Sequence, residues 1–253
     1  MTDSRKIGSI SLFLPAFNDE ATIGGLVRDA AAMLESLTDD YEIIVVNDGS
    51  VDGTGIVLND LAQRVPKVQV VNHDRNEGYG MALRSGFEHS GKELIFYTDG
   101  DGQYDVRELA TLLPLMTEAV DVVNGYKMSR ADTWRRKASG AVYNWLARRL
   151  FRIPIRDVDC DFRLMRRSAV KRIELCTSSG AICVEMVHRL HTAGSVFAEA
   201  PVHHYQRRHG RSQFFTAGRV ARTLFDLGLL WWKLVAMQRF ASGPRYPIYT
   251  VET

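Results

Sequence analysis

The stretch with the clearest potential for chemistry is 98–103, in which two carboxylates, Asp99 and Asp101, lie one residue apart and Gln103 follows. It comes directly after a short apolar run, 94–97, so we expect it at the end of a buried strand. If the segment stays extended, the side chains of Asp99 and Asp101 point the same way and converge. Close carboxylates repel each other, and a divalent cation with hard oxygen ligands, such as Mg²⁺ or Mn²⁺, removes that repulsion. The pattern predicts a cation site, and the alternative is a polar turn.

Short apolar runs alternate with amphipathic segments through the first half of the chain. The apolar runs predict strands at 10–15, 42–46, 68–71, 93–97 and 120–124. The amphipathic segments between them predict helices at 22–37, 54–63, 80–89 and 106–117. This alternation predicts an α/β fold with a mostly parallel central sheet flanked by helices. Sheets of this kind bind ligands beyond the carboxyl ends of their strands.

Polar, turn-rich loops follow four of the predicted strands, at 15–20, 47–54, 76–80 and 98–103. Because the carboxyl ends of parallel strands meet at one edge of a sheet, these loops predict a single acidic cleft. Asp48 is placed to accept a hydrogen bond from a nucleotide base or ribose, or else to cap the next helix near Ser50 or Thr54. Gly78 and Gly80 lack the third glycine of a dinucleotide-binding fingerprint and follow the third strand instead of the first.

The second half of the chain is less regular and carries two basic clusters. Its predicted elements are helices at 134–151 and 182–193, an apolar run at 162–165 and a strand at 196–203. Between Lys127 and Arg152 there are eight basic residues and one acid, and 203–222 contains five arginines and no acid. Basic clusters beside an acidic cleft favour an anionic ligand such as a phosphate, and the alternative is a solvated helix face.

The overall composition is that of an ordinary globular domain. The 253 residues carry a net charge of +2, which by itself implies no special partner. The three cysteines, Cys160, Cys176 and Cys183, have no zinc-site or redox spacing, so we expect free thiols in a reducing compartment. Residues 1–8 lack the apolar core of a signal peptide, and no uncharged run approaches the roughly 20 residues of a membrane span. We expect a cytoplasmic protein or one at the cytoplasmic membrane face, with no nucleic-acid partner because no recognition module is present.

These segments, taken together and in this order, resemble the inverting glycosyltransferases of family 2, and in particular the polyprenyl-phosphate (dolichol-phosphate) hexosyltransferases. The resemblance spans residues 8–215 and rests on the segments 14–20, 46–54, 76–86, 99–103, 157–164, 199–202 and 207–212. It implies a GT-A fold, in which a Rossmann-like nucleotide-binding half is joined to an acceptor-binding half.

The resemblance also implies a nucleotide-sugar donor, with GDP-mannose and UDP-glucose as the two candidates. The residues at the matching positions are Pro15, Ala16, Phe17, Asn18, Glu20, Val46, Asp48, Gly78, Asp99, Gly100, Arg207 and Ser212. It implies that Mg²⁺ or Mn²⁺ is held on the donor diphosphate by Asp99, Asp101 and Gln103.

On the acceptor side, the resemblance implies that Lys127, Arg136 and Ser139 bind a phosphate. Lys127 stands where the family usually has an arginine, which keeps the charge but loses the bidentate geometry. Asp157 matches an acid that serves either as the base or as an organiser of the acceptor site. The catalytic residues implied in this way are Asp101, Asp157, Lys127 and Arg136.

A phosphate acceptor fits the basic cluster at 127–152 better than a hydroxyl does. The second pKa of a phosphate monoester is about 6, so the acceptor is largely dianionic at neutral pH and needs little deprotonation. The enzyme must instead overcome the repulsion between the acceptor phosphate and the donor diphosphate. We therefore expect metal-dependent transfer of mannose or glucose to polyprenyl phosphate. The alternatives are a glycolipid or soluble sugar hydroxyl as acceptor, and a non-catalytic nucleotide-sugar-binding subunit, which the intact Asp99, Asp101 and Gln103 argue against.

The segment 219–237 predicts a helix with a narrow polar face and a broad apolar surface that needs a partner. The partner is either the catalytic domain, a second copy of the chain, or a membrane surface for which the adjacent Trp231 and Trp232 would serve as interface anchors. The sequence thus predicts a catalytic region at 1–215 and a helical region at 216–253.

Overall fold

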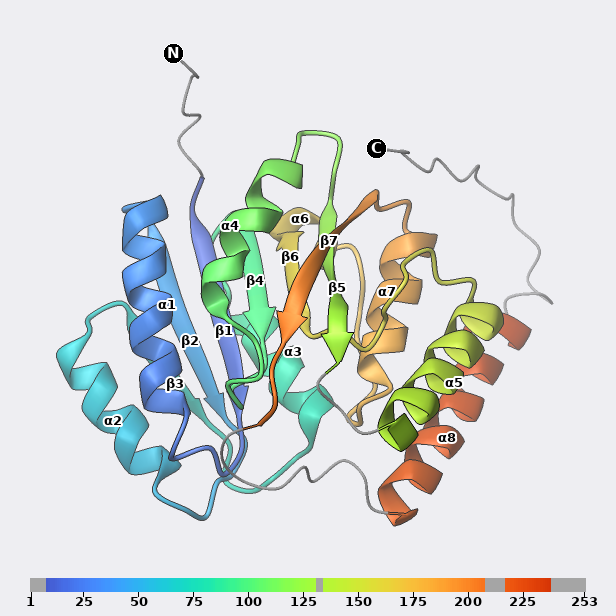
Figure 1. Ribbon diagram of the computed structural model, residues 1–253, viewed down its shortest axis with the longest axis horizontal. Helices are drawn as coiled ribbons and strands as arrows, with labels where there is room; N and C mark the ends of the chain where they lie inside the picture. Colours follow the sequence, from blue (N-terminus) through green and yellow to red (C-terminus); the bar gives the residue numbers. More distant parts are fainter. Residues whose placement is uncertain (1–7, 131–133, 208–216, 238–253) are drawn as a thin grey trace.

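The computed structural model describes residues 8–130, 134–207 and 217–237, with side chains for 8–128, 140–207 and 223–237. Within these ranges the chain forms a seven-stranded sheet with the strand order β3-β2-β1-β4-β6-β5-β7 (Figure 1). The strands are β1 (Ile10–Ala16), β2 (Tyr41–Asn47), β3 (Val68–Asn72), β4 (Leu94–Thr98), β5 (Val122–Arg130), β6 (Phe162–Arg166) and β7 (Phe197–His204).

The sheet is mostly parallel, as the alternation of strands and helices predicts. β1 pairs in parallel with β2 and β4, β2 with β3, and β5 with β7. β6 is antiparallel to both of its neighbours, β4 and β5. β1 and β4 are buried along their whole length, which explains why their sequences read as continuous apolar runs.

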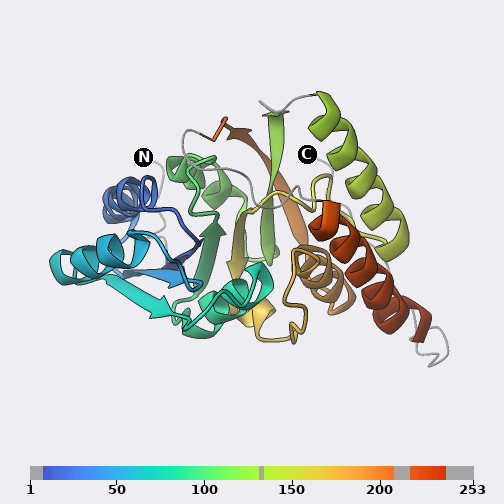
Figure 2. The same cartoon turned by 90° about the horizontal axis from the view of Figure 1, so that it is seen from below.

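Two helical layers cover the two faces of the sheet (Figure 2). On one face α1 (Ile23–Leu37), α2 (Thr54–Arg64) and α4 (Leu109–Leu112) share a hydrophobic core with the strands. On the other face α3 (Tyr79–His89), α6 (Arg167–Val170) and α7 (Ile182–Thr192) form a second core. These layers leave the carboxyl ends of β1, β2 and β4 uncovered for a binding site.

The prediction of a continuous helix at 106–117 is wrong. The structure has three short turns instead, namely η1 (Val106–Glu108), α4 and η2 (Leu113–Leu115). Pro114 lies at the start of η2 and supplies no backbone N–H, and its ring would clash with the carbonyl group four residues earlier in a regular helix.

A third hydrophobic core joins α7 to α5 (Trp134–Phe151) and to the C-terminal helix, which consists of α8 (Ala217–Trp231) and one π-helical segment, η3 (Trp232–Ala236). Leu227, Leu230 and Leu234 are buried in this core. The C-terminal helix therefore packs on the domain, yet several of its large apolar side chains stay exposed, namely Leu224, Phe225, Leu229, Trp232 and Met237. No helix among the described residues is long and apolar enough to cross a bilayer.

His188 lies in this third core and gives it a pH dependence. Its Nδ1 atom is 2.9 Å from the carbonyl oxygen of Phe151, whereas its Nε2 atom has no hydrogen-bond partner among the described residues. Burial lowers the pKa of His188 below its ordinary value of 6.5, so the folded protein binds this proton more weakly than the unfolded chain does. The contribution of His188 to the free energy of unfolding should therefore fall as the pH drops below that value.

We predict that the variant His188→Asn removes this pH dependence, because the asparagine amide can still donate to the Phe151 carbonyl oxygen but does not titrate. Urea unfolding measured between about pH 7 and pH 5 should show a steeper loss of stability for the wild type than for the variant. Parallel stability curves for the two proteins would contradict this role of His188.

Candidate active site

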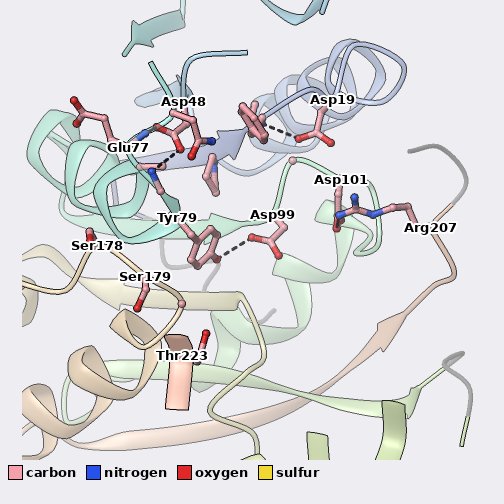
Figure 3. A pocket seen from close by; sticks show the side chains of 18 residues that line it. Asp19, Asp48, Glu77, Tyr79, Asp99, Asp101, Ser178, Ser179, Arg207 and Thr223 are labelled. Atoms are coloured by element: carbon pink, nitrogen blue, oxygen red, sulfur yellow. Dashed lines mark hydrogen bonds and ion pairs between the residues drawn. The ribbon is translucent and has the colours of Figure 1, made fainter. Parts of the chain in front are cut away.

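Two cavities open near the carboxyl ends of the strands, one acidic and one basic. The acidic cavity, of about 510 Å³, is lined by the loops after β1, β3 and β4, by the residue after β2, by residues 178–180 and by Thr223 of α8 (Figure 3). The charged side chains that line it, within the described part of the chain, are five acids and one arginine, namely Asp19, Asp48, Glu77, Asp99, Asp101 and Arg207. The cleft expected from the strand-end loops is therefore present.

Most of the predicted donor residues line the acidic cavity. They are Pro15, Ala16, Phe17, Asp48, Gly78, Asp99, Gly100 and Arg207. Asn18, Glu20 and Val46 do not line it. Asn18 and Glu20 instead tie the first strand-end loop to the second, with Val51 N donating to Asn18 Oδ1 at 2.9 Å and Gly53 N donating to Glu20 Oε2 at 2.6 Å. Val46 is buried inside β2, and Ser212 lies outside the described residues.

Asp48 is buried, and its carboxylate organises the loop on the far side of the cavity. Its Oδ1 atom accepts a hydrogen bond from Glu77 N at 2.9 Å and lies 2.8 Å from Nδ1 of His73, and its Oδ2 atom accepts one from Gly78 N at 3.0 Å. Neither Ser50 nor Thr54 is among these partners, so the helix-cap alternative is wrong. Asp48 thus shapes the cavity wall as well as lining it.

The expected convergence of Asp99 and Asp101 in an extended segment is wrong, because β4 ends at Thr98 and Gly100 and Asp101 form a turn. Figure 3 shows the two carboxylates directed to different partners. Asp99 accepts a hydrogen bond from the Tyr79 hydroxyl at 2.8 Å, and Asp101 pairs with the guanidinium of Arg207.

The carboxylates of this cavity still repel one another. Burial raises the pKa of Asp99 well above its ordinary value, and the negative charges of Asp161 and Asp101 raise it further. The pKa of Asp19 is raised to about 6, chiefly by burial and also by the charge of Asp101. Clustered carboxylates with raised pKa values are typical of functional sites.

The residues present fit a divalent cation only in part. No three His, Cys, Asp or Glu side chains come together as a cation site within the described ranges. The side-chain amide nitrogen of Gln103 donates to the carbonyl oxygen of Tyr205 at 3.0 Å, and Gln103 does not line the cavity. Asp99 and Asp101 do line the cavity, and their negative charges repel each other. A divalent cation bound between them and a donor diphosphate would relieve this repulsion.

The basic cavity, of about 890 Å³, lies between the end of β5, the helix α5 and the loop 153–157. Four cationic side chains and one carboxylate line it, namely Lys127, Arg148, Arg149, Arg156 and Asp157. Arg148 and Arg149 form no ion pair with any residue that the structure describes. Such a lining suits an anion with several charged oxygens.

Asp157 is buried at the edge of the basic cavity. Its Oδ1 atom accepts a hydrogen bond from Nδ2 of Asn144 at 2.9 Å, and the side-chain oxygen Oδ1 of Asn144 accepts one from Val158 N at 2.9 Å. Asp157 lines the basic cavity and not the acidic one. Arg136 and Ser139 belong to α5, but their side chains lie outside the described part of the chain.

Several lining residues were not predicted from the sequence, above all the segment 178–180 that faces the strand-end loops. The buried Glu185 anchors this segment by accepting hydrogen bonds from Cys176 N at 3.1 Å and Thr177 N at 2.8 Å. The Ser178 carbonyl then accepts one from Gly80 N at 2.9 Å. No sequence motif marks these contacts, and the one local signal is the acid Glu185 within the apolar first turns of α7.

Comparisons with known proteins show the family of this chain. Residues 11–174 match the sequence profile of glycosyl transferase family 2. The undecaprenyl-phosphate 4-deoxy-4-formamido-L-arabinose transferase of Enterobacter sp. (strain 638) is 30% identical over 228 residues, which are 90% of this chain and 68% of that protein. The transferase of the same description from Edwardsiella ictaluri (strain 93-146) is 28% identical over 85% of this chain and 65% of that protein. This chain spans about two thirds of the length of these relatives.

Solved structures share the fold at low sequence identity. Mannosyltransferase PcManGT from Pyrobaculum calidifontis, in complex with GDP-Man and Mn²⁺, has a TM-score of 0.67 and 20% identity, covering 97% of this chain and 68% of that one. Glucosyl-3-phosphoglycerate synthase from Mycobacterium tuberculosis, with Mn²⁺, UDP and glucosyl-3-phosphoglycerate, has a TM-score of 0.63 and 19% identity, covering 93% and 80%. The fold, the acidic cavity and the family match lead to one conclusion: this chain belongs to glycosyl transferase family 2 and is a glycosyltransferase with the GT-A fold.

Proposed function

We propose that this glycosyltransferase moves a hexose, mannose or glucose, from a nucleotide sugar to polyprenyl phosphate with inversion at the sugar carbon. The observation that carries the proposal is the pairing of an acidic cavity with a basic one near the carboxyl ends of the strands. The names of the two relatives, both undecaprenyl-phosphate sugar transferases, support a polyprenyl-phosphate acceptor.

The acidic cavity is the proposed donor site. A nucleoside diphosphate is itself anionic, so five acidic side chains around it would be unfavourable without a positive counter-charge. Asp99 and Asp101 would hold Mg²⁺ or Mn²⁺ there, and the cation would offset the charge that develops on the leaving diphosphate. Arg207, which pairs with Asp101, is the one cationic side chain among the described residues that line this cavity, and it would be available to the diphosphate.

The basic cavity is the proposed site of the acceptor phosphate. Its four cationic side chains would attract a dianionic acceptor phosphate and so offset the repulsion between that phosphate and the donor diphosphate. In the reaction, a phosphate oxygen forms a bond to the anomeric carbon of the hexose, and the bond from that carbon to the diphosphate oxygen breaks with its electron pair. A dianion needs no base for this step, so we assign Asp157 to positioning of the acceptor site through Asn144.

Lys127 is the proposed link between the two sites. It lines the basic cavity, and its positive charge also counteracts the rise in the pKa of Asp99, which lines the acidic cavity. Its Nζ atom donates to the carbonyl oxygen of Asp159, which holds the ammonium in place. A cation here would screen the repulsion between the acceptor phosphate and the donor diphosphate.

We further propose that the outer faces of α5 and α8 rest on a membrane surface, where a polyprenyl chain resides. Large apolar side chains are exposed on both helices, among them Trp145 and Leu150 of α5 and Phe225 of α8, with Trp232 in the adjoining η3. The arginines of the basic cavity lie beside Trp145 and suit anionic lipid headgroups.

A transfer assay with a panel of donors and acceptors tests this function. With GDP-mannose or UDP-glucose and Mn²⁺, we expect sugar to appear on polyprenyl phosphate and not on soluble sugars or on a neutral glycolipid. We also expect faster transfer when the polyprenyl phosphate is presented in anionic vesicles than in vesicles of neutral lipid. Transfer to a sugar hydroxyl alone would overturn the phosphate acceptor, and no transfer from any donor would favour a non-catalytic nucleotide-sugar-binding subunit.

A further inference from the structure

The wall of the donor cavity between β3 and α3 depends on a single carboxylate. Asp48 accepts the backbone N–H groups of both Glu77 and Gly78, and both residues line the cavity. The neighbouring backbone at 75–76 packs so closely on Gly49 that a Cβ atom there would lie 2.2 Å from the Arg75 carbonyl carbon. Packing therefore fixes the start of the loop, whereas the Asp48 hydrogen bonds hold its end.

His73 holds that carboxylate in place. Its Nδ1 atom is 2.8 Å from Asp48 Oδ1 and its Nε2 atom is 2.9 Å from the hydroxyl oxygen of Ser85. The two side chains of the His73–Asp48 pair are only 10% and 5% exposed, so water competes little for these bonds. The backbone of His73 is fixed as well, since its N–H donates to the Asn47 carbonyl at 2.9 Å.

An Asp–His–Ser chain of hydrogen bonds also occurs in enzymes that use a serine nucleophile, but that chemistry does not fit here. Ser85 lies within α3 and lines neither the acidic nor the basic cavity, so a substrate in either one would not reach its hydroxyl. His73 does not line either cavity. The chain ends instead, through Asp48, on the two backbone amides of the donor wall.

We propose that His73 is a positioning residue for donor binding: held by Ser85, it orients the Asp48 carboxylate so that the Glu77–Gly78 backbone keeps the shape that receives the nucleoside diphosphate. This proposal rests on the donor site proposed above. Without a donor from His73, the Asp48 side chain can rotate and lose the Gly78 or the Glu77 amide. Binding of the donor should then weaken, while the chemistry at the sugar and the binding of the acceptor stay as they are.

The chain offers variants that separate positioning from simple packing. In His73→Asn the side-chain amide nitrogen stands near the place of Nδ1 and can still donate to Asp48. In His73→Gln the amide reaches toward Ser85 instead, and His73→Leu keeps the bulk but donates to neither. His89→Asn is the control, because His89 is an exposed histidine of α3, the helix that carries Ser85, and lines neither cavity.

Titration calorimetry with GDP and with UDP, in Mn²⁺, gives the first measurement. We expect His73→Leu and His73→Gln to weaken nucleotide binding at least fivefold and to raise the donor KM by a similar factor, with kcat within about twofold of the wild type. His73→Asn should restore most of the affinity, and His89→Asn should bind as the wild type does. Equal weakening by His73→Asn and His73→Leu would overturn the proposal, because a packing role needs no donor at that position.

Amide hydrogen exchange of the peptide that contains Glu77 and Gly78 gives the second measurement, and it needs no nucleotide. We expect faster exchange of these amides in His73→Leu than in His73→Asn or the wild type. Unchanged exchange in His73→Leu would overturn the positioning role. A wild-type protein that binds neither nucleotide would instead overturn the proposed donor site, whatever the exchange shows.

Discussion

Replacement of Asp101 by alanine should lower the rate of sugar transfer by roughly 10²–10³-fold, the size of effect seen when one charge-stabilising group is removed from an active site. Asp101 faces the acidic cavity and carries the negative charge nearest to Arg207. Its loss would remove a cation ligand and alter the guanidinium that we assign to the leaving diphosphate. The measurement is kcat/KM for the wild type and the variant over a range of Mn²⁺ concentrations.

Two controls make this result specific. Asp60→Ala removes an exposed carboxylate that pairs with Arg64 on α2 and lines neither cavity, and this variant should transfer sugar at the wild-type rate. Asp101→Asn keeps the size of the side chain and should lose nearly as much activity as Asp101→Ala, because charge and not shape is required. Asp101→Ala that retains metal-dependent turnover would contradict the role we assign to this carboxylate.

Replacement of Arg163 by methionine should destabilise the fold by about 3–5 kcal/mol, because three buried hydrogen-bond acceptors lose their donor at once. Arg163 is fully buried, and its guanidinium donates to the Asn124 side chain, the Tyr97 hydroxyl and the Val158 carbonyl. Methionine fills much of the space but leaves all three oxygen acceptors without this donor, and each buried unpaired group costs free energy.

Urea unfolding of Arg163→Met measures this loss directly, and the exposed Arg64→Met is its control, for which a change within about 0.5 kcal/mol is expected. A loss of less than about 1 kcal/mol in Arg163→Met would show that the network contributes little. Because the Val158 carbonyl belongs to the loop that carries Asp157 and Asp159, residual folded Arg163→Met should also show a raised acceptor KM.

Local patterns in the sequence were enough for the framework of this protein. The strands β1, β2 and β4 read as apolar runs because they are buried along nearly their whole length. The polar loops that follow the parallel strands had to meet at one edge of the sheet. The interruption at Pro114 shows the limit of such patterns. The helical spacing of apolar residues continues through this position, but proline prevents the backbone from forming a regular helix there.

Contacts between distant parts of the chain could not be predicted in this way. Asp48 was expected to contact a ligand or its own loop, but its partners lie 25 to 30 residues further along. Glu185 lies among apolar residues in the first turns of α7, and it anchors the segment 178–180 that lines the acidic cavity. Neither contact leaves a periodic signal, because each depends on one side chain and a loop backbone.

The sequence by itself determined that this protein is an α/β glycosyltransferase with an acidic cleft at its strand ends and a basic cluster in its second half. Only the tertiary structure decided how those charges are arranged: Asp99 turns to Tyr79, and Asp101 to Arg207, which is 106 residues away. The reason is physical. Burial of apolar runs depends on residue type and spacing, which are local, whereas the direction of a carboxylate depends on whichever hydrogen-bond donor the fold brings within reach.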